Sequence, residues 1–280
     1  MRRLALTLIA LGLLLHVRRV EAQHAASLTA LPSASWLTAL SVAVRKDAIE
    51  APDSIGSGWT RLHLDKEKGR HVVVLFRLRD GVEPTAFLAA LDTARMTPST
   101  GLAVGGPEVV RNAEVVMDLT PGRYVLACMV RDTIGARRHL VTGESKAFVV
   151  TPRRSANRAT AKPPSASTEV HMMDFAYRAP ERWRRGAQWV RVSNEGKEDH
   201  LLLIARLRDG ATLREWATAT LTDTVVAKPL TGVARTSPGG VVYLPLSLSP
   251  GRYVLHCRVQ HSVSGMLHEK MGMFKEITVE

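Results

Sequence analysis

Short apolar runs bounded by turn residues are the dominant pattern along the chain. In the C-terminal part these runs cover residues 188–193, 201–207, 241–248, 253–259 and 274–279. Runs of this length, rich in Val, Leu and Tyr and separated by Gly, Pro and Ser, are typical of β-strands. Several such strands per hundred residues predict an all-β sandwich.

A helical pattern interrupts the strands once in each half of the chain. Thr212 can cap the segment LREWATATL, and the segment VEPTAFLAALDTARM occupies the corresponding place in the first half. A Thr directly before a periodic apolar segment is a helix start signal. We therefore expect a short helical insertion in each half of an otherwise all-β chain.

The two halves of the chain are copies of one another. Placing His71 over His200 gives an offset of 200 − 71 = 129 residues, which holds without a gap over 80 positions, 22 of them identical. HVVVLFRLRDG lies over HLLLIARLRDG, and LTPGRYVLACMV lies over LSPGRYVLHCRV. Similarity at one fixed period predicts a tandem duplication.

The repeat sets the expected domain boundaries. The first copy covers residues 24–151 and the second covers residues 168–280. Residues 152–167 between them are rich in Pro, Ser, Ala and Arg and have no apolar period. This composition predicts an extended, exposed linker.

Residues 1–22 have the pattern of a secretory signal peptide. The segment begins with a basic pair, continues with an apolar run too short to span a bilayer, and ends in a small-residue site at Ala22. Arg18 and Arg19 follow the apolar run, so an uncleaved anchor is the alternative. We expect a periplasmic or secreted protein with no membrane span after cleavage.

Composition and charge exclude several classes of protein. With 45% hydrophobic and 23% charged residues the chain is ordinary globular material. The formal net charge of +12 is scattered and aromatic residues make up only 5%, so nucleic acid is not an expected partner. Two cysteines are too few for a disulfide framework or a four-cysteine zinc site.

Candidate metal ligands gather in the second copy. His200 opens one predicted strand, Cys257 ends another, and His268 and Met273 follow. Two imidazoles, a thiolate and a weak axial thioether form the ligand set of a type 1 copper site. We therefore expect one copper ion per chain, held by the second copy.

The same residues resemble the plastocyanin/azurin-like cupredoxins. VSNEGKEDHLLLI is similar to the segment that presents the first copper histidine, and PGRYVLHC is similar to the strand that carries the copper cysteine. The spacing of His268 and Met273 also matches the last two ligands of that family. The resemblance implies a Greek-key sandwich, copper near one end, and electron transfer or copper carriage, with a redox partner protein or a copper donor as partner.

The loop after the cysteine leaves a second ligand choice open. Typical members of the family have the second histidine only a few residues after the cysteine, which favours His261 and Met266 as rival ligands. We prefer His268 because the first copy keeps its equivalent, His139, at the same spacing. The longer spacing also resembles secreted cupredoxin-like proteins of unassigned role, in which a Gly-Met follows the loop histidine.

The first copy has a weaker candidate set. His71, Cys128 and His139 are present, but Glu144 stands where the second copy has Met273. A carboxylate on the axis would harden the site and lower its preference for Cu(I). We expect this copy to be a poorer copper site or a scaffold.

Three classes of function follow from these observations. The first is an exported copper protein that shuttles electrons or holds the metal. The second is a metal-free β-sandwich module for binding or for envelope structure, in which Cys128 and Cys257 are buried thiols. An enzyme is not expected, because the chain contains no His-x-His pair, no Gly-x-Ser-x-Gly turn and no His-Glu-x-x-His segment.

Overall fold

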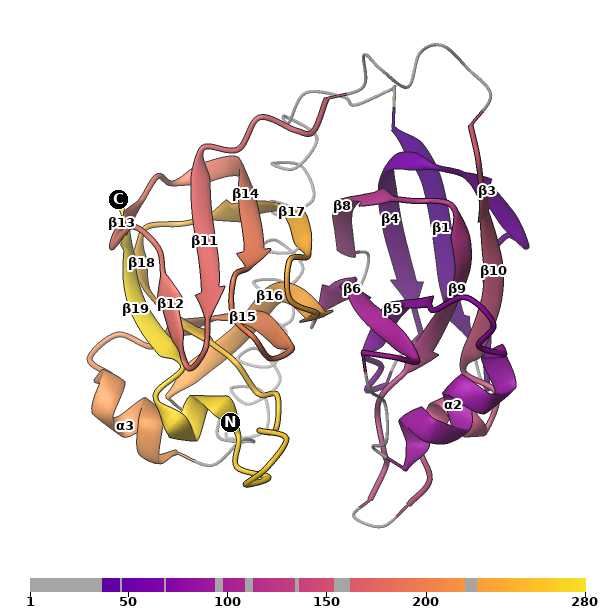
Figure 1. Cartoon of the computed structure of the whole chain (residues 1–280). Helices are drawn as coiled ribbons and strands as arrows, with labels where there is room; N and C mark the ends of the chain where they lie inside the picture. The colour runs from indigo at the N-terminus through magenta and orange to yellow at the C-terminus, as the bar shows by residue number, and fades with distance from the viewer. Residues whose placement is uncertain are drawn as a thin grey trace, which may run out of the picture.

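The structure of this chain, a computed structural model, describes residues 37–45, 47–67, 69–93, 98–108, 113–133, 136–153, 162–219 and 226–280. Two β-sandwiches stand side by side, each with a short helix at the same end of the molecule (Figure 1). The expected signal peptide at residues 1–22 and the middle of the expected linker lie outside the described residues. Among the described residues, no helix is long and apolar enough to cross a membrane.

The first sandwich is built from two sheets. One has the strand order β2-β1-β4-β8 and the other has the order β6-β5-β9-β10-β3. The helix α2 lies against β9 and the short 3₁₀ turn η1. The elements are β1 Thr38–Arg45, β2 Ala48–Glu50, β3 Ser54–Gly56, β4 Gly58–Lys66, β5 Val73–Leu78, α2 Pro84–Asp92, β6 Gly101–Gly105, β7 Pro107–Glu108, β8 Ala113–Leu119, β9 Gly122–Cys128, η1 His139–Val141 and β10 Ser145–Thr151.

The second sandwich repeats this plan strand for strand. Its sheets have the orders β12-β11-β14-β17 and β13-β19-β18-β15-β16. The elements are β11 Thr168–Met173, β12 Ala176–Arg178, β13 Arg182–Trp183, β14 Gly186–Asn194, β15 His200–Leu207, α3 Leu213–Thr218, β16 Ala227–Thr236, β17 Val241–Leu248, β18 Gly251–His256, η3 His268–Met271 and β19 Phe274–Val279. The prediction of an all-β, two-copy Greek-key sandwich is confirmed.

The expected strands and helices lie close to their predicted positions. The strands β17 and β19 have the predicted bounds, and Thr212 caps α3 in a capping box with Glu215. The strand predicted over residues 253–259 is shorter than expected, because β18 ends at His256. The amide of Cys257 donates to the carbonyl of Met273, as in a continuing strand. The carbonyl of Cys257 accepts instead from the amide of Glu269 in the loop, so the strand pairing ends there.

Burial follows the alternation expected of strands with one face on a core. In β4 every second residue is buried, from Gly58 through Lys66. The tyrosines of the two PGRY segments are buried at equivalent places, and their hydroxyls donate to backbone carbonyls, Tyr124 to Thr120 and Tyr253 to Ser249. Each turn before a cysteine strand is thus tied to the strand that follows it.

Both sheets continue from one domain into the other. At the domain boundary β16 pairs with β6 and β7, and β17 pairs with β8, all antiparallel. The amide of Ala234 donates to the Gly106 carbonyl at 2.7 Å, and the amide of Ser237 donates to the Ala103 carbonyl at 2.8 Å. The two sandwiches are therefore joined by main-chain hydrogen bonds as well as by side chains.

Aromatic side chains close the same boundary. The ring of Trp59 in the first domain meets the ring of Tyr243 in the second edge-on, with centroids 5.5 Å apart. Trp189 and Val116 are buried beside them, and Ala166, within the expected linker, packs against the group. The described end of that segment is thus partly buried, where the sequence predicted an exposed chain.

The hydroxyl of Ser237 supplies a test of this boundary. It accepts the amide N–H of Ala103 at 2.9 Å and donates to Asp199 at 2.7 Å. Ser237→Ala would leave a buried N–H without a partner, and we expect it to lower the free energy of unfolding by roughly 1–3 kcal/mol. Urea unfolding followed by circular dichroism measures this change.

The matched control is Ser54→Ala, which removes an exposed hydroxyl and should change stability by less than about 0.5 kcal/mol. Equal effects of the two substitutions would contradict the importance of the Ser237 contact.

Candidate metal centres

The second domain brings three of the predicted ligands together. His200 opens β15, Cys257 directly follows β18, and His268 opens η3. All three side chains are fully buried. One donor atom from each lies within 4.8 Å of the others, and we call this group the second-domain cluster.

Two contacts define the shape of this cluster. The Nδ1 atoms of His200 and His268 are 3.1 Å apart, and the sulfur of Cys257 lies 3.6 Å from Nδ1 of His268. The amide N–H of Leu201 points at the same sulfur from 3.5 Å. Two nitrogens and one sulfur therefore face a common point.

The outer nitrogens of the two rings, both Nε2, face carboxylates. Nε2 of His200 lies 3.1 Å from a carboxylate oxygen of Asp174, and Nε2 of His268 lies 3.3 Å from one of Glu198. An ionised carboxylate only accepts hydrogen bonds, so the neutral His200 ring donates from Nε2 to Asp174 and keeps a lone pair on Nδ1. Nδ1 of His268 lies within hydrogen-bond distance of that lone pair, whereas Nε2 of His268 makes an ion-pair contact with Glu198 and no hydrogen bond.

Burial favours the neutral form of both rings. It lowers the pKa of His200, and the nearby Asp174 carboxylate opposes this shift only in part. Burial also lowers the pKa of His268, and the charge of His200 adds to that effect. Neutral imidazole is the form that binds metal ions.

Burial has the opposite consequence for the cysteine. It raises the pKa of the Cys257 thiol to about 11, so the thiol keeps its proton at neutral pH when no cation is bound. A coordinating thiol is deprotonated outright by a metal ion. The donor set thus fits a soft cation, with one thiolate and two neutral imidazoles.

The absence of a side chain at Gly196 allows the contact between Asp174 and His200. A Cβ atom on Gly196 would lie 2.4 Å from the Asp174 carboxylate and 2.7 Å from Nε2 of His200. Asn194, buried at the start of the same turn, donates to the carbonyls of Glu198 and Thr236 at 2.8 and 2.7 Å. This turn therefore positions the first histidine from behind.

The long loop after Cys257 turns back on itself before His268. Gln260 pairs with Leu267 as an isolated bridge, and the amide of His261 donates to the Met266 carbonyl at 2.8 Å. The intervening residues project outward, so the eleven-residue spacing still returns His268 to the cysteine. We call residues 258–267 the ligand loop.

The rival ligands lie outside the second-domain cluster. Nε2 of His261 contacts Glu198 at 3.1 Å, and its Nδ1 contacts the Ser264 hydroxyl at 2.9 Å. Met266 is half exposed on the outward turn. The geometry therefore gathers His268 with the cysteine and leaves His261 and Met266 at the rim.

Met273 is fixed near the cluster by its backbone. Its amide donates to the His268 carbonyl at 2.9 Å, and its own carbonyl accepts from the amide of Cys257 at 3.2 Å. The side chain is fully buried in the sandwich core. Its role as the axial ligand remains a prediction.

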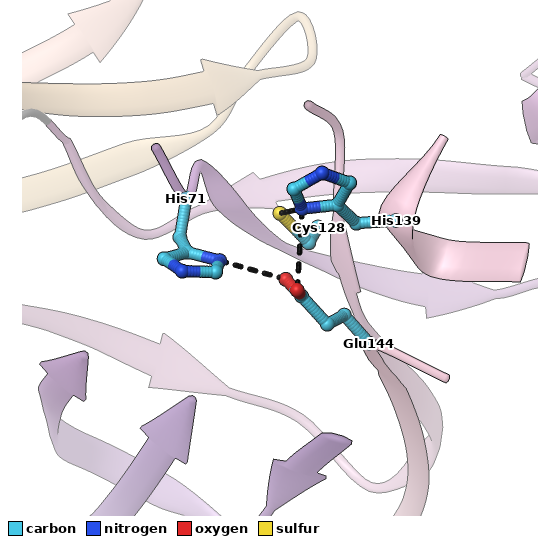
Figure 2. A group of neighbouring side chains, drawn as sticks. All are labelled: His71, Cys128, His139 and Glu144. Carbon is cyan, nitrogen blue, oxygen red and sulfur yellow. Dashed lines mark hydrogen bonds and ion pairs between the residues drawn. The ribbon is translucent and has the colours of Figure 1, made fainter. Parts of the chain in front are cut away.

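The first domain holds a matching group with a different centre. Figure 2 shows the carboxylate of Glu144 between the rings of His71 and His139, with the sulfur of Cys128 beside His139. One carboxylate oxygen lies 2.8 Å from Nδ1 of His71, and the other lies 3.2 Å from Nδ1 of His139. The sulfur lies 3.8 Å from the same nitrogen of His139. We call these four residues the first-domain cluster.

The Glu144 carboxylate thus lies between the two imidazole rings and contacts both of them. Burial raises the pKa of the Cys128 thiol to about 12, and the neighbouring Glu144 carboxylate contributes to this shift. Nε2 of His139 contacts Asp132 at 3.0 Å, so its Nδ1 also faces inward. His139 is mostly buried, with 14% of its side-chain surface exposed.

The sequence did not point to the three carboxylates at the outer nitrogens, Asp132, Asp174 and Glu198. Asp174 belongs to the turn between β11 and β12, 26 positions before His200. Asp132 aligns with His261 in the repeat, so the two copies share no pattern there. No local motif would have identified these residues.

Comparison with known proteins finds similarity in three dimensions alone. No family model and no curated protein matches the sequence. Auracyanin from Roseiflexus castenholzii is 18% identical, with 41% of this chain and 99% of that chain covered and a TM-score of 0.29. The blue copper oxidase from Nitrosomonas europaea is 12% identical, with coverages of 87% and 85% and a TM-score of 0.23. The copper-containing nitrite reductase from Thermus scotoductus is 12% identical, with coverages of 86% and 61% and a TM-score of 0.24.

The strand orders of the two sheets repeat in both domains, and each domain gathers its His, Cys and His at the end of the strand pair β5–β9 or β15–β18. By this architecture the chain is a tandem pair of β-sandwiches of one strand order, the plan expected from the resemblance to cupredoxins.

Proposed function

We propose that the second domain binds one copper ion and that the protein carries electrons or copper outside the cytoplasm. His200, Cys257, His268 and Met273 would hold the ion. The observation that supports this proposal is the convergence of two inward Nδ1 atoms and one sulfur within 4.8 Å, all fully buried.

The donor set fits an ion that changes between two oxidation states. Thiolate and thioether sulfur favour Cu(I), whereas imidazole suits both oxidation states of copper. When bound, copper supplies one-electron chemistry. The protein supplies a fixed donor geometry, because the carboxylates of Asp174 and Glu198 orient both rings.

The closed cluster favours electron transfer or metal carriage over catalysis on a substrate. His200, Cys257 and His268 have no exposed surface, so a substrate would find no direct route to the donor atoms. The sequence also contains no His-x-His pair of the kind used between domains in copper oxidases.

The ligand loop supports a partner site next to the cluster. Among the described residues, the large apolar side chains that are exposed are Val149, Val263 and Met266, and the last two lie on this loop. Phe175 packs edge-on against the rings of both His261 and His268 beneath the loop. A redox partner protein or a copper donor would approach closest to His268 here.

Export is part of the proposal. The signal-like segment at residues 1–22 supports a periplasmic or secreted location. Both cysteines are free, which agrees with a role for Cys257 as a ligand rather than as half of a disulfide.

Loading the chain with Cu(II) tests the ligand set. In the Cys128→Ala chain, in which Cys257 is the one remaining cysteine, we expect one copper and an intense visible thiolate-to-copper absorption, which is lost when Cys257→Ala is added because the thiolate is its origin. His268→Ala should shift or remove the band. Absorption spectroscopy combined with elemental analysis measures both quantities.

His261→Ala and Cys128→Ala are the matched controls and should keep the band, since neither residue belongs to the second-domain cluster. A colourless protein without stoichiometric copper would contradict the proposal and favour the metal-free module. Loss of the band in His261→Ala would instead assign the rival loop ligand.

The contact between Asp174 and His200 gives a second prediction. The carboxylate charge of Asp174 orients the His200 ring and raises its basicity. Asp174→Asn removes this charge, so we expect copper affinity to fall roughly 10- to 100-fold. Competition with a chelator of known affinity measures the change.

Asp209→Asn, the same chemical change at an exposed turn, is the control and should leave the affinity unaltered. Equal affinities for the wild-type chain and Asp174→Asn would show that this carboxylate does not support the metal centre.

A further inference from the structure

We propose that the first-domain cluster is a second metal centre of a different kind, a site for a divalent cation of fixed valence of the zinc class. His71, Cys128, His139 and Glu144 would be its four ligands. This inference concerns the first domain and does not rest on the proposed copper function of the second.

The four donor atoms already surround a common point. Each oxygen of Glu144 faces the Nδ1 atom of a different imidazole, at 2.8 and 3.2 Å, and the sulfur of Cys128 completes the group at 3.8 Å from His139 (Figure 2). Zinc bonds to N, O and S are about 2.0–2.3 Å long, which places neighbouring ligands of a tetrahedral ion roughly 3.3–3.6 Å apart. The observed separations lie on either side of this range, so small side-chain shifts would admit the ion.

The charge of the donor set selects a divalent ion. With the thiolate of Cys128 and the carboxylate of Glu144, the first-domain cluster carries two negative charges, which a divalent cation neutralises. The second-domain cluster carries one, from Cys257, because Met273 is neutral. A buried site is penalised for uncompensated charge. A monovalent ion would leave one negative charge in the first domain, so Cu(I) is disfavoured there.

The chemical type of the donors leads to the same choice. Zinc in proteins is held by four ligands drawn from Cys, His and Asp or Glu. Replacing a thioether by a carboxylate removes a soft donor and adds a hard one, which favours an ion without a redox cycle. The two domains would thus bind different metals because the residue directly before the last strand is Glu144 in the first domain and Met273 in the second.

The surroundings of the first-domain cluster also suit an entering ion. Nε2 of His139 contacts the carboxylate of Asp132, which orients the ring with Nδ1 inward. The side chains of His71 and His139 keep 11% and 14% of their surface exposed, and Asp132 is 81% exposed beside them. In the second-domain cluster the two histidines and the cysteine are fully buried. A hydrated cation therefore has a route with an acidic residue at its mouth.

The test uses the full chain carrying Cys257→Ala, which removes the thiolate of the second-domain cluster. Zinc is added without copper, since copper binds most N, O and S sites more tightly. We expect one tightly held zinc per chain after gel filtration, measured by elemental analysis. Cobalt is the optical probe, because zinc has a filled d shell, and it should give a thiolate-to-metal band that is lost in Cys128→Ser.

Glu144 supplies the decisive variants. Glu144→Gln keeps the size of the side chain and removes its charge, so we expect zinc affinity to fall at least about tenfold. Asp118→Asn, the same change at an exposed strand position, is the matched control and should have no effect. Glu144→Met should lower zinc affinity and give the first domain a visible copper band, because it recreates the donor set of the second domain.

Absence of stoichiometric zinc in the Cys257→Ala chain would overturn the proposal, as would equal zinc affinity in the wild-type and Glu144→Gln sites. In either case the carboxylate is only an ion-pair partner of the two histidines. Circular dichroism checks that Glu144→Gln is folded, and if it is not, Cys128→Ser provides the same comparison through the cobalt band. Failure of the copper proposal is detected separately, in the Cys128→Ala chain loaded with copper.

Discussion

Three main-chain hydrogen bonds hold three of the four candidate ligands of each domain in place. In the second domain the amide of His268 donates to Val259, the amide of Met273 donates to His268, and the amide of Cys257 donates to Met273. The equivalent amides in the first domain, those of His139, Glu144 and Cys128, make the same three bonds. Because only backbone atoms take part, this backbone frame is independent of the side chains that it carries.

A frame of this kind allows one substitution to change the chemistry of a centre without changing its geometry. Glu144 and Met273 leave the frame at the same place, after a glycine with positive φ, Gly143 or Gly272. A Cβ atom on Gly143 would lie 2.0 Å from the backbone oxygen of Asp47, so a side chain there is excluded. The residue after the glycine is therefore the position at which the two candidate ligand sets differ.

The sequence predicted what depends on local pattern and on the repeat. The PGRYVLHC segment, the capped helix at Thr212 and the one-to-one match of strands follow from turn residues, periodicity and a constant offset. The preference for His268 over His261 came from comparing the two copies, and the structure places only His268 beside the cysteine.

Features that depend on distant contacts could not be predicted in this way. Asp174 contacts His200 because two separate turns converge around Gly196, and the hydrophobic periodicity of the sequence carries no information about such a contact. The bridging position of Glu144 was also missed, because the sequence shows that a carboxylate replaces a thioether but not where its oxygens point. The joining of the sheets across the domains involves edge strands whose partners are not encoded locally.

That joining has a consequence for how the duplicated chain is organised. Strand β16 is the repeat equivalent of β6, and β17 is the equivalent of β8, so each edge strand pairs with its own counterpart in the other copy. This is the arrangement of an isologous two-fold interface, contained within one polypeptide. Each copy covers an open sheet edge of the other, the kind of edge that otherwise invites association between chains. A single copy would need a second molecule for the same protection, and the duplication makes that protection independent of protein concentration.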